Sequence, residues 1–191
     1  MLLEKRQILV ISLLIEGILV SIFLIWSAFR DIHLIVFPQT WSIILGLLLS
    51  LPLFGLNYFF FGPPAERVRE FQGCVQFKRH VVKPLADRLD VASALLVATL
   101  AGLGEELFFR GVLQHEFGLV AASVAFAILH FGPAIRSYYL VASLYLVFGF
   151  YFGFLMYFTQ DLWVPIITHV VYDFGALLYL KHVYKLEHQL R

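Results

Sequence analysis

Apolar runs long enough to cross a bilayer recur along this chain, with short polar stretches between them. A membrane-spanning helix needs about 20 mainly apolar residues. Six segments fit this description, although the fourth is short, and the pattern therefore predicts an all-α, polytopic transmembrane bundle of about six spans. The predicted spans cover residues 8–29, 41–61, 91–115, 119–131, 138–158 and 162–180.

The long polar segment, residues 62–90, has a pattern of its own. Its apolar residues recur at intervals of three, four or seven, which is typical of an amphipathic helix. Such a helix would lie on the inner leaflet of the membrane. A solvated loop broken at Gly73 and Pro84 is the alternative. The apolar stripe comprises Val68, Phe71, Val75, Val82, Leu85 and Leu89, and leaves Arg67, Arg69, Lys78 and Arg79 away from it.

Composition supports a membrane protein. Hydrophobic residues make up 61% of the chain and charged residues 14%, which is too apolar for a soluble domain to cover with polar surface. The net charge of +1, with no basic arm, argues against a nucleic-acid partner. The single cysteine, Cys74, excludes an intrachain disulfide and a paired-cysteine metal site, and is predicted to be an inert thiol.

Basic residues gather on alternate connections between the predicted spans. With the N-terminus in the cytoplasm, twelve of the fourteen Lys and Arg residues fall inside, whereas Arg30 falls outside and Arg110 lies within a span. Cytoplasmic loops carry such an excess of positive charge, so both termini are predicted to be cytoplasmic. The twelve are Lys5, Arg6, Arg67, Arg69, Lys78, Arg79, Lys83, Arg88, Arg136, Lys181, Lys185 and Arg191.

Three ionisable residues, Glu105, Glu106 and Arg110, fall inside the apolar third span. Each costs at least ~2.5 to 3.5 kcal/mol at the centre of a membrane helix. Glu106 and Arg110 are four residues apart and can pair on one helix face. Glu105 lies about 100° around the helix from Glu106. Glu105 is therefore predicted to be the freer acid.

Two other spans carry polar groups to a similar depth. If the third and fourth spans turn near Phe117 and Gly118, then Glu105 and His130 both lie about 12 residues, or roughly 18 Å, below the turn. His169 and Asp173 in the last span are four residues apart, and lie roughly 10 and 16 Å below its outer end. We expect these side chains to meet inside the bundle.

Such a cluster suits hydrolysis of a peptide bond. Glu105 could take a proton from water, while His130 orients that water and helps to protonate the leaving amine. His169 and a protonated or hydrogen-bonded Asp173 could stabilise the developing oxyanion. A zinc ion held by His130, His169 and a carboxylate from Glu105 or Asp173 fits the same residues. The spacing alone does not separate these two mechanisms.

Three motifs in order, Glu105-Glu106-x-x-x-Arg110, Phe126-x-x-x-His130 and His169-x-x-x-Asp173, resemble the signature motifs of the CAAX protease and bacteriocin-processing family of intramembrane endopeptidases. The resemblance covers about residues 91–180. It implies a water activated by Glu105 with help from His130, with His169 and Asp173 near the oxyanion, and with Glu106 and Arg110 supporting the site. Members have been described as metalloproteases and as metal-independent glutamic proteases, and we favour the mechanism without a cofactor. The third motif of the family ends in Asn or Asp, and an aspartate is the poorer oxyanion donor unless protonated.

The sequence thus predicts three parts. Residues 1–90 form two transmembrane helices and a cytoplasmic amphipathic linker, residues 91–180 the catalytic transmembrane core, and residues 181–191 a cytoplasmic tail. The predicted activity is intramembrane endopeptidase cleavage, in the cell membrane, of a membrane protein or lipidated peptide substrate that meets the enzyme in the lipid bilayer. The rivals are a proton-coupled carrier, since buried Glu, His and Asp also form proton relays, and a non-catalytic immunity or binding protein.

Each polar residue also has a purely structural interpretation. Glu105, Glu106 and Arg110 could be an ion network that fixes helix packing, and the histidines could make interfacial or interhelical hydrogen bonds. Glu16, alone in the first span, is expected to face the bundle or to snorkel, and a functional role for it is the less favoured interpretation.

Overall fold

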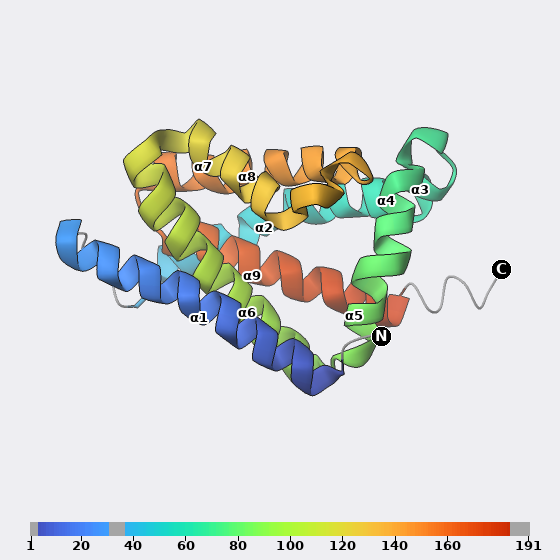
Figure 1. The fold of residues 1–191 in the computed structure, drawn as a ribbon, viewed down its shortest axis with the longest axis horizontal. Coiled ribbons are helices and arrows are strands. Elements are labelled where there is room, and N and C mark those ends of the chain that lie inside the picture. The colour runs from blue at the N-terminus through green and yellow to red at the C-terminus, as the bar shows by residue number, and fades with distance from the viewer. Residues whose placement is uncertain (1–3, 31–36, 184–191) are drawn as a thin grey trace.

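The computed structural model describes residues 4–30 and 37–183, and this part of the chain is almost entirely helical, with no strand. Six long helices make up most of these described residues, and Figure 1 shows their arrangement. They are α1 (Lys5–Arg30), α2 (Thr40–Phe61), α6 (Val91–Phe108), α7 (Gln114–Phe131), α8 (Tyr139–Thr159) and α9 (Trp163–Leu178). The shorter elements are α3 (Pro63–Glu66), η1 (Arg69–Phe71), α4 (Gln72–Phe77), η2 (Lys78–Val82), α5 (Lys83–Arg88), η3 (Phe109–Leu113), η4 (Gly132–Arg136) and η5 (Tyr179–Val183).

Five helical segments of the described chain are long and apolar enough to cross a membrane. The third, Val91–Arg136, is 46 residues long and contains two limbs. They meet at Gly118, whose φ of 83° and ψ of 169° interrupt the helix in a conformation that glycine adopts readily. The predicted turn near Phe117 and Gly118 is confirmed, as is the all-α membrane bundle. The cytoplasmic placement of the termini stays a prediction, and residues 184–191 of the predicted tail lie outside the described residues.

The linker between α2 and α6 is helical but broken, and α4 and α5 cross the ends of α2, α8 and α9 (Figure 1). Val75 and Leu89 of the predicted apolar stripe are buried. The placement of Lys78 away from the stripe is wrong: this residue is 1% exposed. Its amine donates hydrogen bonds to the Phe61 carbonyl at 2.5 Å and to Glu66 at 3.3 Å. The π-helical turn η2 begins at Lys78, so the regular helical period does not continue through it.

Cys74 in α4 is fully buried, and this burial raises the pKa of its thiol to about 11. A thiol reacts as the thiolate, and a raised pKa leaves little thiolate at neutral pH. This environment therefore agrees with the prediction that Cys74 is inert.

The helix α9 packs between α2 and α6 because both present small residues to it. A Cβ atom added at Gly46 of α2 would lie 2.8 Å from Ile167 Cβ, and one added at Gly102 of α6 would lie 2.9 Å from the backbone nitrogen of Val170. Small residues at spacings of four allow membrane helices to approach closely. The buried small residues on these two faces are Ser42, Gly46 and Ser50 in α2, and Ala94, Ala98 and Gly102 in α6.

Replacing Gly102 with leucine should destabilise the protein by about 1 to 3 kcal/mol, because the new side chain would overlap the backbone of α9. The measurement is the midpoint of thermal unfolding in detergent. Gly55→Leu in α2 is the matched control, since a Cβ at Gly55 meets no atom within 4 Å. Equal midpoints for the two variants would contradict the close contact between α6 and α9.

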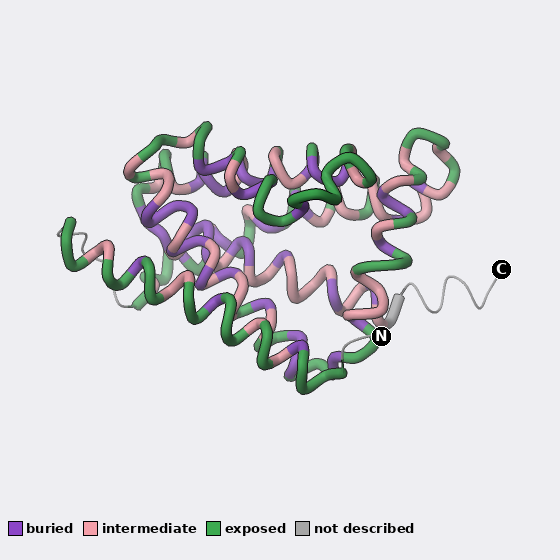
Figure 2. Tube along the Cα trace, in the orientation of Figure 1, coloured by how far each residue is buried: buried purple, intermediate pink, exposed green. Residues whose placement is uncertain are grey.

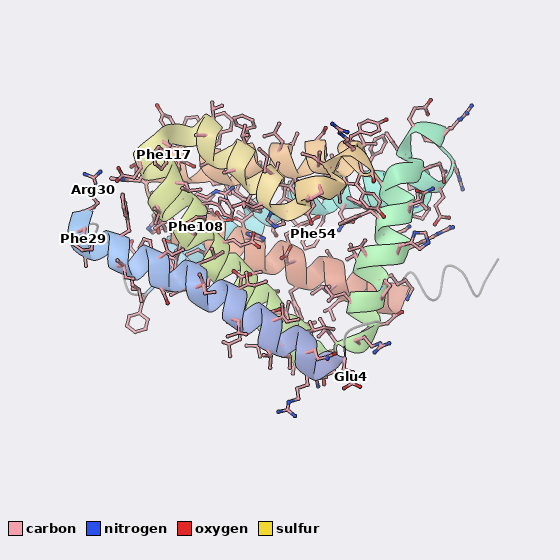
Figure 3. All side chains as sticks on the ribbon, viewed as in Figure 1. Glu4, Phe29, Arg30, Phe54, Phe108 and Phe117 are labelled. Carbon is pink, nitrogen blue, oxygen red and sulfur yellow. The ribbon has the colours of Figure 1, made fainter. Side chains whose placement is uncertain are left out.

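Polar contacts hold the helix ends in register. At one end, the Lys5 amine contacts Asp90, and the Asp90 carboxylate caps α6 by accepting a hydrogen bond from the Ser93 amide at 2.8 Å. These two bonds hold the pKa of Asp90 well below its usual range. At the other end, Arg30 pairs with Glu116 at 2.6 Å. Figure 3 shows Arg30 and Glu4 at opposite ends of α1. Helices α1 and α6 are thus parallel neighbours, as the first and third of a series of alternating spans must be.

Candidate active site

The predicted site residues come from three helices and one π-helical turn, and the structure brings all six together. Glu105 and Glu106 lie on α6, Arg110 in η3, His130 in the last turn of α7, and His169 and Asp173 on α9. Each of these elements contains buried residues (Figure 2).

Glu106 is the centre of a buried network and is 0% exposed. Its Oε1 atom accepts a hydrogen bond from Arg110 at 3.0 Å, which confirms the predicted pair. The same oxygen lies 2.8 Å from Nδ1 of His169, a contact that the sequence did not reveal. Arg110 also donates to the Gly149 carbonyl of α8 at 3.0 Å. Glu106 therefore joins α6, η3 and α9, and its interactions leave it poorly placed to act as a base.

Aromatic rings enclose the Arg110 guanidinium. Its central carbon lies 5.7, 4.9 and 5.3 Å from the ring centroids of Phe109, Phe126 and Phe152. A cation over desolvated aromatic faces gains about 2 kcal/mol or more. The π-helical turn η3, which carries Arg110, directly follows the two glutamates, and such turns are frequent at functional sites.

Glu105 has a different environment from its neighbour. Its Oε1 atom lies 3.4 Å from Nε2 of His130, and its Oε2 atom lies 4.0 Å from Nε2 of His169. His130 Nδ1 donates to the Phe126 carbonyl at 2.8 Å, which fixes the ring with Nε2 toward Glu105. The expected meeting of Glu105 and His130 across the hairpin is confirmed.

His169 lies between carboxylates on both sides. Nδ1 faces Glu106, and Nε2 lies 3.5 Å from Oδ2 of Asp173, one helical turn along α9. Its ring stacks on Phe152 with centroids 4.7 Å apart and an interplanar angle of 13°. The Asp173 side chain is 32% exposed. His169 is thus rigidly oriented, whereas Asp173 lies at the open edge of the site.

A cavity of about 310 Å³ reaches the site at Asp173. Tyr145 and Tyr172 line it beside Asp173, and Phe77 and Leu85 line it from the linker. The wall is mainly apolar. The site is therefore open toward the end of the bundle that α4 and α5 cross.

Glu16, for which the sequence favoured no functional role, lies close to the site. Glu16 of α1 is 7% exposed and packs against Gly104, the residue before Glu105. Its expected position facing the bundle is confirmed. The signal that could have found it was the cost of a lone carboxylate in an apolar span.

A zinc site would need three or more ligands converging on one point. Within residues 4–30 and 37–183, no group of three His, Cys, Asp or Glu side chains is arranged to hold a metal ion. Of the alternative zinc ligands, His130 and His169 turn Nε2 toward Glu105 and Asp173, and His169 Nδ1 already contacts Glu106. This arrangement does not fit a metal without movement of the side chains.

The comparisons with known proteins agree with the residues of the site. Residues 87–175, just under half of the chain, match the family model described as type II CAAX prenyl endopeptidase Rce1-like. This part of the chain is therefore similar to the Rce1-like family. All six site residues fall within the matched range.

This chain is also similar to a curated protein. The Bacillus subtilis (strain 168) protein named "Uncharacterized protein YpbD" is 31% identical over 108 residues, which are 56% of this chain and 56% of the relative. The chain thus spans about half the length of the curated relative it matches. No solved structure matches this chain.

Proposed function

We propose that this protein is an intramembrane endopeptidase in which Glu105 activates the attacking water. One observation carries the proposal: Glu106 is committed to Arg110 and His169, whereas Glu105 faces His130 Nε2 at 3.4 Å. Two adjacent acids thus have different environments, which is how sites assign different tasks to similar groups. The family match supports peptide hydrolysis as the reaction class.

The chemistry requires two proton transfers. Glu105 accepts a proton from water as the water oxygen attacks the peptide carbonyl. In the proposed mechanism, His169 and Asp173 face the negative charge that develops on the carbonyl oxygen, and a hydrogen bond from either would stabilise it. The carbon–nitrogen bond then breaks, and the proton passes through Glu105 or His130 to the leaving amine. Water is consumed, and one acid and one amine are released.

The cavity beside Asp173 suggests the class of substrate. Its mainly apolar wall suits a lipid chain or apolar side chains more than a charged peptide. We infer a membrane-associated substrate, within the cell membrane, that enters from the end crossed by α4 and α5. The family description names prenyl endopeptidases, so a prenylated C-terminal peptide is the first substrate to test.

The test uses purified protein in lipid nanodiscs with internally quenched peptides. One peptide carries an S-farnesylated cysteine near its C-terminus, and its partner has the same sequence without the lipid. We expect cleavage of the farnesylated peptide to exceed that of its partner. Equal cleavage of the two peptides would support the proposed endopeptidase activity and contradict a preference for lipidated substrates. Cleavage of neither peptide, together with an unchanged set of protein termini in cells that overproduce the enzyme, would contradict the proposal.

Chelation separates the metal-free mechanism from the zinc alternative. We expect the initial rate to stay within experimental error after incubation with 1,10-phenanthroline, because the proposed steps use only side chains. The control is the non-chelating isomer 1,7-phenanthroline at the same concentration. Loss of activity with the chelating isomer alone, restored by added zinc, would favour a metal held by His130, His169 and a carboxylate.

A further inference from the structure

Glu16 is a buried acid that the proposed mechanism does not use. It lies in the middle of α1, outside the matched family range, and is 7% exposed. Its Oε2 atom is buried and has no hydrogen-bond partner among the residues that the structure describes. A carboxyl group buried without a partner is costly, so a structural role alone does not account for it.

The position of Glu16 beside the catalytic helix depends on a glycine. A Cβ atom added at Gly104 would lie 2.5 Å from Glu16 Oε2 and 3.1 Å from Glu16 Cα. Any larger residue at position 104 would displace the acid. The absence of a side chain at Gly104 therefore gives the Glu16 carboxyl group room against α6, at the residue that precedes Glu105.

The electrostatic surroundings of Glu16 are those of the site. The charged groups that interact electrostatically with it are Glu105, His130, His169 and Asp173. These groups lie on α6, α7 and α9. Glu105 also has a buried Oε2 atom, 4.0 Å from His169 Nε2, that makes no hydrogen bond within the described part of the chain. Two neighbouring carboxyl groups thus each have an oxygen to satisfy, and close carboxyl groups avoid double ionisation by keeping one proton between them.

We propose that Glu16 is a positioning residue of the hydrolytic site, which donates a hydrogen bond to Oε2 of Glu105, directly or through one water. This bond satisfies both oxygens. It holds Oε1 of Glu105 toward His130 and the attacking water. The inference rests on the proposed role of Glu105 and adds a residue from α1 to it.

The kinetic test compares three variants with the farnesylated peptide. Glu16→Leu keeps the size of the side chain and removes the donor, and we expect kcat to fall about a hundredfold with KM unchanged, as misplacement of a reacting group does. Glu16→Gln keeps a donor and should restore most of kcat. Gly104→Ala should lower kcat by displacing Glu16, whereas Gly17→Ala, whose Cβ meets no atom within 4 Å, should not. Wild-type kcat in Glu16→Leu, or an equal fall in Glu16→Leu and Glu16→Gln, overturns the proposal.

Two further measurements distinguish a loss of hydrogen bonding by Glu16 from misfolding and from a failure of the proposed function. Thermal unfolding midpoints show whether Glu16→Leu folds, and we expect no decrease because the span becomes more apolar. Infrared spectroscopy, which needs no substrate, detects the carbonyl stretch of a protonated carboxyl group. The stretch should be present in the wild type, vanish in Glu16→Gln and shift in Glu105→Gln. If Glu16→Gln leaves this carbonyl stretch unchanged, the inference is overturned even if the enzyme is active. If the stretch disappears in Glu16→Gln, the inference is supported even if no peptide is cleaved.

Discussion

Replacing Glu105 with glutamine should lower kcat by about a thousandfold, the typical contribution of a general base. The amide has nearly the size of the carboxyl group but cannot accept a proton from water. Because Glu105 makes no ion pair with Arg110, in contrast to Glu106, we expect the fold to tolerate this change. The measurement is the initial rate of peptide cleavage, together with the unfolding midpoint.

Two variants control this experiment. Glu70→Gln removes an exposed acid of η1 and should leave the rate unchanged. Glu106→Gln should lower the unfolding midpoint as well as the rate, since Glu106 binds Arg110 and His169. If Glu105→Gln cleaved peptides at the wild-type rate, the assignment of the base would be wrong. Flux of protons or solutes through wild-type vesicles, with no cleavage, would instead favour a carrier.

The bilayer makes much of this fold readable from the sequence. Each span must satisfy its backbone hydrogen bonds internally, so an apolar run long enough to cross the bilayer is expected to form a helix. The turn at Gly118 was predictable because glycine interrupts two apolar runs there, and the common depth of Glu105 and His130 follows from the helical rise. Such distances along an axis need no knowledge of how the helices are rotated.

Contacts between helices depend on that rotation, which the spacing does not determine. The contact of His169 with Glu106 requires α9 to turn Nδ1 toward α6, a position that the small residues of α2 and α6 allow. The burial of Lys78 follows from a π-helical turn that regular periodicity does not anticipate. Glu16 stands alone in its span, and its relation to the site appears only once α1 packs on α6.

The second large effect is expected at Arg110. Arg110→Met replaces the guanidinium with an apolar side chain of similar length and should destabilise the protein by about 3 to 5 kcal/mol, because it leaves Glu106 as a buried charge without its cation. The Gly149 carbonyl loses its donor as well. The unfolding midpoint in detergent measures the loss. Arg69→Met, at an exposed position, should stay within about 0.5 kcal/mol of the wild type.

A double variant distinguishes loss of the pair from loss of packing. Glu106→Gln combined with Arg110→Met removes both charges and should recover part of the stability lost in Arg110→Met, since the uncompensated carboxylate is gone. His169 can still bond the amide oxygen at position 106, so part of the catalytic rate should return with the stability. The contradicting outcome is a loss of stability in the double variant that exceeds the losses in the two single variants added together. The aromatic packing of Arg110, rather than its ion pair, would then be its main contribution to the fold.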